Sequence, residues 1–250
     1  MTTTPVALVT GSGKRRVGAV VADALADRGY SIVIHYRQSA TEARDAVLEY
    51  ERRGVRAVAI AAELTDPSAV ESLVAQTLAH FGRLDVLVHA ASIWPRKPLE
   101  QVTAADLREN WEVNTLATFL CVQHAGLAMV RQPSGGSIVT IGDWATIRPY
   151  RDYSAYFASK GSIPTITRTM ASELAARNPQ VRVNCILPGP VMLPPDLSAE
   201  ERAEAIAGTL VKREGRPHHI ALAALHFIDN DFVTGTVLPV DGGRSIQSDS

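Results

Sequence analysis

The stretch VALVTGSGKRRVGAVV, residues 6–21, decides the fold because it joins a strand pattern to a helix pattern through a glycine loop. The apolar run Val6–Thr10 predicts a buried strand, and the apolar periodicity of Val17–Arg28 predicts a helix. Backbone amides at the start of a helix are unpaired and favour an anion, which Gly11 and Gly13 allow to approach closely. A glycine loop alone is also compatible with an ordinary tight turn. The stretch therefore indicates a phosphate-binding turn that the rest of the chain has to support.

The alternation of strand and helix patterns continues along the whole chain. Further strands are predicted at Ser31–Tyr36, Val55–Ala61, Val86–Ala90, Ser137–Ile141, Val181–Leu187 and Thr236–Val240. Helices are predicted between them at Thr41–Arg53, Pro67–Phe81, Ala104–Arg131, Ser154–Asn178 and His218–Asp229. Strands such as DVLVHAA are continuously apolar, which is typical of strands covered by helices on both faces. The sequence predicts a single α/β domain over residues 1–250, a doubly wound Rossmann-type fold with a seven-stranded parallel sheet.

Composition excludes several classes of function. A net charge of -1 over 250 residues offers no general attraction for nucleic acid or an anionic membrane, so we expect a small-molecule substrate. No signal peptide pattern or membrane-spanning apolar run is evident, and we expect a cytoplasmic protein. Cys121 and Cys185 are spaced neither for a metal site nor for a disulfide framework, and we expect both to be buried.

The end of the second predicted strand indicates which dinucleotide binds. Folds of this class that bind NAD place an acid there for the ribose 2′-hydroxyl, whereas the 2′-phosphate of NADP requires that acid to be absent. Here the strand continues into Arg37 and Ser39. We expect Arg37 and one or two of Lys14, Arg15 and Arg16 to surround the extra phosphate. A solvated basic helix start is the alternative, which the helix dipole disfavours.

Tyr156 and Lys160 are the first candidates for chemistry. Four residues apart in a helix pattern, they lie on one face, where a lysine cation favours ionisation of a tyrosine. Tyr153 is seven residues from Lys160, so Tyr156 is the better candidate.

Taken together, these residues resemble the short-chain dehydrogenase/reductase family over nearly the whole chain. The family's motifs occur in order as the Thr10-Gly11 loop, AELTD, HAAS, NWEVNT, YFASK, LPGPV and VTGTVLPVDGG. The resemblance implies that Asn114 belongs to the catalytic set and holds a water linked to Lys160. It also implies further cofactor-binding residues, namely Gly11, Val17, Tyr36, Glu63, Leu64, His89, Ala90, Ala91, Tyr156, Lys160, Pro188, Gly189 and Val191.

Three features resemble the pteridine reductases within that family: Arg16 in the loop, the HYRQSA strand end, and Asp143 thirteen residues before Tyr156, where a serine is usual. This resemblance implies NADPH-dependent reduction of a dihydropteridine, with Asp143 bonding Tyr156 or passing it a proton. The segment VMLPPDL is also similar to the pteridine reductases' substrate loop, expected here over residues 188–212. The implied substrate-binding residues are Arg16, Ile93, Trp94, Asp143, Tyr156 and Leu193.

The chain also departs from the family pattern. Its glycine loop is one residue longer, which leaves open whether Arg15 or Arg16 faces the cofactor. His89 replaces an asparagine, and no second ligand is spaced to make it a metal site. Ile93 or Trp94 takes the place of the phenylalanine that stacks on the pterin. Pro164 removes the amide that would bond the Lys160 carbonyl, so we expect a local kink.

Two other functions remain open from the sequence. The first is a ketone or 3-oxoacyl reductase of the same family, and the second is a catalytically idle NADP-binding regulator. The resemblance also implies a homotetramer, with the helices near Asn110–Arg131 and Ser154–Asn178 packed against other subunits.

Overall fold

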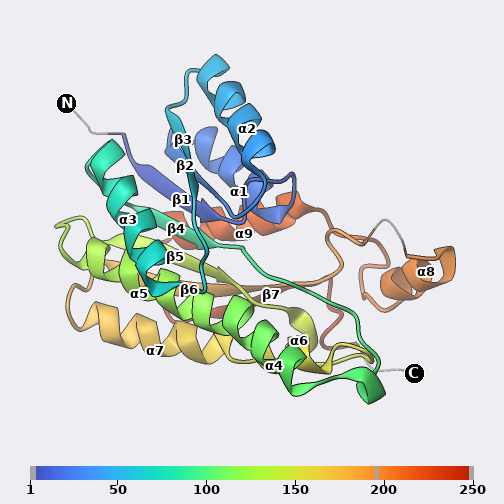
Figure 1. Ribbon diagram of the computed structural model, residues 1–250. Coiled ribbons are helices and arrows are strands. Elements are labelled where there is room, and N and C mark those ends of the chain that lie inside the picture. The colour runs from blue at the N-terminus through green and yellow to red at the C-terminus, as the bar shows by residue number, and fades with distance from the viewer. Residues whose placement is uncertain (1–3, 195–196, 248–250) are drawn as a thin grey trace.

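A seven-stranded parallel sheet runs through the computed structural model, which describes residues 4–194 and 197–247 (Figure 1). The strands are β1 (Val6–Thr10), β2 (Ser31–Tyr36), β3 (Ala57–Ala61), β4 (Val86–His89), β5 (Gly136–Ile141), β6 (Val181–Pro188) and β7 (Val237–Val240). Their order is β3-β2-β1-β4-β5-β6-β7, and every neighbouring pair is parallel. The predicted doubly wound fold is confirmed, and the strand ends differ from the predicted ones by at most two residues.

Helices cover both faces of the sheet (Figure 1). The α-helices are α1 (Val17–Ala26), α2 (Ala40–Arg52), α3 (Pro67–Phe81), α4 (Ala104–Asn110), α5 (Ala117–Val130), α6 (Ser154–Lys160), α7 (Ile163–Ala175), α8 (Ala199–Ala207) and α9 (Pro217–Asp229). Successive strand residues point to opposite faces, so Leu8 packs in the core with α3, α5 and α7, whereas Val9 packs with α1, α2 and α9. Burial on both faces explains why the strands are continuously apolar.

Two predicted helices are interrupted. Between α4 and α5 the stretch predicted as Ala104–Arg131 contains a π-helical segment, Trp111–Leu116. The helix predicted as Ser154–Asn178 is divided, since α6 ends at Lys160 and α7 begins at Ile163. Pro164 lies in the first turn of α7, where no helical hydrogen bond requires its missing amide. The expected interruption at Pro164 is therefore present.

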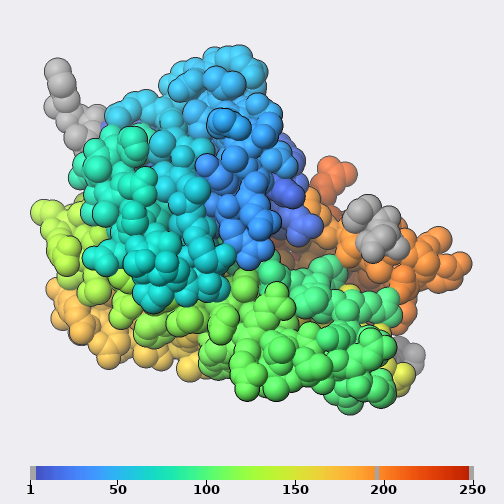
Figure 2. All heavy atoms as spheres, viewed as in Figure 1, coloured from blue at the N-terminus to red at the C-terminus, as the bar shows by residue number. Residues whose placement is uncertain are grey.

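The segment after β6 differs from the irregular loop expected over residues 188–212, because it contains α8. Ser198 and Glu201 form a capping box in which each side chain accepts the other's backbone amide. In Figure 2 the orange residues of α8 project beside the green segment that follows β4. Pro195 and Asp196 of the expected substrate loop lie outside the described residues.

The continuous helical stretch Ala104–Val130 is long and apolar enough to cross a membrane by length and composition. Most of its apolar window is buried inside the protein, where Leu120, Val122 and Met129 pack in the core. The stretch is therefore a core helix of this fold.

A buried arginine joins β6 to the end of α9. The Arg182 Nη1 donates to the carbonyl oxygens of Phe227, Asn230 and Val233 at 2.5, 3.0 and 3.1 Å, and Nη2 donates to Ile228 O at 2.9 Å. The last carbonyl groups of a helix have no amide partner within the helix. The buried Arg182 side chain supplies hydrogen-bond donors to these carbonyls at the end of α9.

Replacing Arg182 should destabilise the fold. Arg182→Met leaves the Ile228 carbonyl oxygen without a donor and removes one of the donors to Phe227, Asn230 and Val233, so we expect the free energy of unfolding in urea to fall by about 1 to 3 kcal/mol. Arg177→Met is the matched control, because Arg177 pairs with Glu173 on an exposed surface and its loss should cost only about 0.5 kcal/mol. Equal effects of the two substitutions would contradict this role for Arg182.

Candidate active site

A cavity of about 780 Å³ opens at the carboxyl ends of the strands, where the strand order reverses between β1 and β4. Ligands of open α/β sheets bind at such a point. The structure places most of the predicted site residues in its lining: Gly11, Lys14, Arg16, Val17, Tyr36, Arg37, Ser39, Glu63, Leu64, Ala90, Ala91, Ile93, Trp94, Asp143, Tyr156, Lys160, Pro188, Gly189, Val191 and Leu193. Three predicted site residues, Arg15, His89 and Asn114, do not line it.

The glycine loop fits tightly between the ends of β2 and β4. Gly11 has a φ of +67°, and a Cβ there would lie 2.8 Å from the Ala91 Cα. A Cβ on Gly13 would lie 2.7 Å from the Tyr36 Cβ. No side chain caps the start of α1 after this loop, so its first amides remain available to a ligand. This arrangement suits the diphosphate of a dinucleotide.

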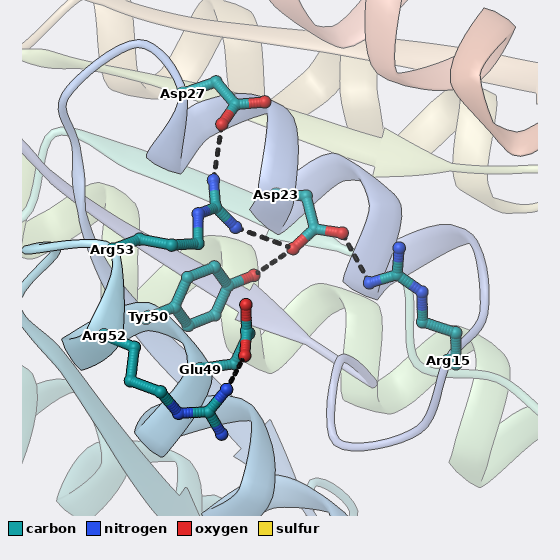
Figure 3. Close-up of polar contacts among 7 residues, drawn as sticks. All are labelled: Arg15, Asp23, Asp27, Glu49, Tyr50, Arg52 and Arg53. Carbon is teal, nitrogen blue, oxygen red and sulfur yellow. Dashed lines mark hydrogen bonds and ion pairs between the residues drawn. The ribbon is translucent and has the colours of Figure 1, made fainter.

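The three consecutive cations of the loop point in different directions. Lys14 and Arg16 line the cavity, whereas Arg15 forms an ion pair with Asp23 on α1 and is 76% exposed (Figure 3). Asp23 also accepts a hydrogen bond from the Tyr50 hydroxyl and forms an ion pair with Arg53. This placement favours Arg16 over Arg15 as the residue that meets a cofactor.

Arg37 lies at the same end of the cavity as Lys14 and Arg16. Its guanidinium is 3.6 Å from the Glu63 carboxylate, at the end of β3. The pair is half exposed, so an incoming phosphate can compete with Glu63 for Arg37 at small cost. The donor set of this end, three cations and a helix start, fits a phosphorylated dinucleotide.

The catalytic candidates meet at the ends of β5 and α6. The Tyr156 hydroxyl donates to the Asp143 Oδ2 at 2.7 Å, and the Asp143 Oδ1 accepts the Ala145 amide at 2.8 Å. Lys160 follows Tyr156 by one helical turn, and its Nζ donates to the Ile141 carbonyl at 2.9 Å. Tyr153, by contrast, stacks on Trp94. The geometry thus matches the choice of Tyr156 over Tyr153.

Burial dominates the electrostatics of this group. It raises the pKa of Asp143 above its ordinary value and, together with the Asp143 charge, raises the pKa of Tyr156 well above 10.0. Burial also lowers the pKa of Lys160 to about 8. Burial and the Asp143 carboxylate together determine the direction of the Tyr156 pKa shift, while the Lys160 Nζ bonds the Ile141 carbonyl. Tyr156 is a protonated donor in this arrangement.

Asn114 lies behind the cavity, in the π-helical segment Trp111–Leu116. Its side chain accepts the Ile93 amide at 2.9 Å and donates to the Ile93 carbonyl and to Ser159 Oγ at 3.1 and 3.0 Å. Asn114 therefore ties the cavity wall after β4 to helix α6, which carries Tyr156 and Lys160. Local π-helical geometry is frequent at such functional positions.

His89 has a structural environment that sequence patterns did not indicate. The Thr10 Oγ1 accepts the amides of Ala90 and Ala91 at 3.1 and 3.3 Å, so it donates its hydrogen to the His89 Nδ1 at 3.0 Å. Burial lowers the pKa of His89 to about 3, and the ring is neutral. Across the described residues, no cluster of three or more histidine, cysteine, aspartate or glutamate side chains is arranged for a metal ion.

Two arginines outside the sequence prediction connect α8 to the cavity. Arg96 pairs with Asp152 and with Glu201 of α8, each at 3.2 Å. Arg244 lies 4.8 Å above the Trp144 ring and donates to the Ala205 carbonyl near the end of α8. Both arginines line the cavity, yet they come from segments without a recognisable motif, so only the tertiary structure identifies them.

Comparisons with known proteins agree with this architecture. A family model described as enoyl-(acyl carrier protein) reductase matches residues 12–245. A 3-oxoacyl-[acyl-carrier-protein] reductase of Synechocystis sp. is 33% identical over 246 residues, which cover 96% of this chain and 97% of the relative. The structure of acetoin dehydrogenase from Enterobacter cloacae superimposes with a TM-score of 0.88 at 33% identity and covers 100% of this chain and 98% of that one. A blue fluorescent protein from a metagenomic library, solved in complex with NADPH, has a TM-score of 0.87 at 33% identity, with 97% and 98% covered.

Proposed function

The chain belongs to the short-chain dehydrogenase/reductase family, as an oxidoreductase acting on carbonyl compounds with a nicotinamide cofactor, and from this premise we propose that it is an NADPH-dependent ketone reductase. One observation carries the proposal. The Tyr156 hydroxyl, held 2.7 Å from Asp143, lines the same cavity as the phosphate-binding cations Lys14, Arg16 and Arg37. A proton donor and a dinucleotide site thus share one enclosed space.

The residues of the chain divide the work of carbonyl reduction. When bound, NADPH supplies the hydride for the carbonyl carbon. Tyr156 donates a proton to the carbonyl oxygen, since its raised pKa keeps it protonated until negative charge develops there. Asp143, once protonated, returns a proton to Tyr156 across the contact in which its carboxylate otherwise accepts the Tyr156 hydroxyl. Lys160 would hold the nicotinamide ribose, and Asn114, which bonds Ile93 and Ser159, would keep helix α6 and the cavity wall in place behind it.

A ketone is favoured over a pteridine by the names of the relatives. One is named for a 3-oxoacyl substrate and one for acetoin. Reduction of a dihydropteridine is the second candidate, and Asp143 at the position of the usual serine, with Arg16 in the cavity, favours it. The cavity-facing Tyr156, Lys160 and Asp143 argue against an idle NADP-binding regulator.

Substrate class is tested by NADPH oxidation with a 3-oxoacyl thioester, small ketones and a dihydropteridine. We expect kcat/KM for the best ketone to exceed that for the dihydropteridine by about tenfold or more, a difference of about 1.4 kcal/mol in transition-state binding. Turnover of the dihydropteridine alone would support the second candidate. No oxidation with any of these compounds, nor with a ketone attached to an aromatic ring, would contradict both candidates and favour the regulator.

Cofactor preference follows from the cations. NADPH should bind at least about 100-fold more tightly than NADH, because two charge-assisted hydrogen bonds to the 2′-phosphate contribute about 1.5 to 3 kcal/mol each. Arg37→Asp should remove most of this preference, measured by fluorescence titration with both cofactors. Equal affinities in the wild type would refute the assignment.

Arg15 and Arg16 provide a matched pair for the same titration. Arg16→Met should weaken NADPH binding about tenfold or more, since Arg16 lines the cavity. Arg15→Met should change it less than about twofold, since Arg15 pairs with Asp23 outside the lining. A larger effect at Arg15 would reverse this assignment.

Catalytic roles predict a distinct order of losses. Asp143→Ala should lower kcat about 100-fold or more without changing NADPH affinity, and Tyr156→Phe should be at least as damaging. Asp143→Ser should recover part of the activity, because a hydroxyl at this position can still bond Tyr156. Tyr153→Phe is the control and should be mild, since it keeps the ring stacked on Trp94. An inactive Tyr153→Phe beside an active Tyr156→Phe would exclude this active site.

Assembly into a homotetramer is part of the proposal. The helical stretch Ala104–Val130 exposes Trp111, Phe119 and Leu127 to 50%, 38% and 39%, which a packed subunit would cover. Light scattering at micromolar concentration should give four times the chain mass of 26.9 kDa. A monomer at that concentration would contradict it.

A further inference from the structure

Aromatic side chains concentrate at the substrate end of the cavity. Trp94, Trp144, Tyr150 and Tyr153, called here the aromatic wall, all line it next to Tyr156. They include two of the three tryptophans of a chain that is only 6% aromatic. The core has little share in this group, since its largest fully buried side chains include a single aromatic residue, Phe227.

The rings of the aromatic wall brace one another. Trp94 stacks on Tyr153 with centroids 5.2 Å apart and planes 18° apart, and Tyr150 meets Tyr153 edge-on at 5.2 Å. Trp144 stacks on Tyr150 at 6.1 Å, and Arg244 covers Trp144. These contacts fix the ring planes before any ligand arrives, which lowers the entropy cost of binding to them.

Part of the aromatic wall remains uncovered. Trp94 and Tyr150 are 40% and 37% exposed, although they line a cavity. The Trp94 and Tyr156 ring centroids are 6.4 Å apart, so the two side chains are neighbours in the lining. The segment after β6 contributes the apolar side chains of Met192, Leu193 and Leu197 to the lining, and α8 adds Glu201 and Glu204. A flat apolar group between Trp94 and these apolar side chains would therefore lie beside the Tyr156 hydroxyl.

The charged side chains around the aromatic wall indicate which class of ligand it can bind. Aromatic rings also attract organic cations. Arg96, Arg151 and Arg244 line the same cavity beside Asp143, Glu201 and Glu204, and Arg96 pairs with Glu201, so the acids next to the aromatic wall are balanced by arginines and offer no surplus negative charge to an organic cation. Of the ligand classes that bind aromatic surfaces, a neutral or electron-rich conjugated ring is therefore the better match to the aromatic wall.

We propose that the aromatic wall binds a planar conjugated ring of the substrate, so that the preferred substrate is a ketone fused or attached to an aromatic ring. This inference rests on the proposed ketone reduction and specifies its substrate class. The ring stacks on Trp94, and the adjacent carbonyl oxygen reaches Tyr156. A saturated ring of the same skeleton buries a similar area and lacks the stacking contribution of an aromatic pair.

The test compares 2-tetralone with 2-decalone, which share one bicyclic skeleton. Isothermal titration calorimetry on the NADP⁺-loaded protein measures binding without turnover. We expect 2-tetralone to bind about three- to tenfold more tightly, the range of one aromatic pair. Trp94→Leu should remove this difference, and Trp94→Phe, which keeps a ring, should retain it. Phe232→Leu is the control, because Phe232 is 97% exposed and outside the cavity lining.

Three results would overturn the proposal: equal or tighter binding of 2-decalone by the wild type, a difference that survives in Trp94→Leu, and no detectable binding of either ketone at millimolar concentration. The parent proposal fails separately. Preferential binding of 2-tetralone by a protein that reduces no ketone would leave the aromatic wall in place and exclude ketone reduction. Equal affinity for 2-tetralone and 2-decalone, with rapid reduction of both, would support ketone reduction and exclude the proposed role of the aromatic wall.

Discussion

The reversal of strand order between β1 and β4 determines where every functional group of this protein lies. Parallel strands end at one edge of the sheet, and the chain leaves β1 and β4 in opposite directions. The opening between them receives the glycine loop from one side and the segment of Ile93 and Trp94 from the other. Thr10, at the end of β1, holds the two sides together through the Ala90 and Ala91 amides. Cofactor and substrate residues distant in sequence thus become neighbours.

Three consecutive cations at a helix start conflict with the helix dipole, and the structure resolves the conflict by directing them apart. Arg15 turns to Asp23, two turns along α1, and leaves the anion site. Within residues 4–194 and 197–247, Lys14 and Arg16 have no ion-pair partner, and both face a cavity that Arg37 also lines. The unfavourable charge at the start of α1 is therefore accounted for by a ligand with several phosphates.

Sequence patterns were sufficient for the sheet because burial on both faces makes each strand an apolar run that glycine and polar residues delimit. They also placed Tyr156 and Lys160 on one face of a helix. Helix α8 was missed although Ser198 and Glu201 provide a capping signal, because the prolines before it indicated a loop. Trp94 was predicted from the family resemblance, whereas Arg96, Trp144, Tyr150 and Tyr153 had no signal, since the two connections that carry the aromatic wall, after β4 and after β5, meet only in the folded chain. Asn114, which the resemblance implies holds a water linked to Lys160, lies behind the cavity, where its side chain bonds Ile93 and Ser159.

The hydrogen bond between Tyr156 and Asp143 has a direction that bears on proton transfer. One carboxylate oxygen is occupied by the Ala145 amide, so the other is fixed toward Tyr156 and its hydroxyl hydrogen points at Asp143. A substrate carbonyl would need that hydrogen to point the other way. Protonation of Asp143 achieves this, because the acid then donates to the tyrosine oxygen and releases the hydroxyl hydrogen toward the cavity. Burial raises the pKa of Asp143, which favours the protonated acid at a given pH. Burial of the Asp143 carboxyl therefore favours the arrangement in which the Tyr156 hydroxyl hydrogen can point into the cavity.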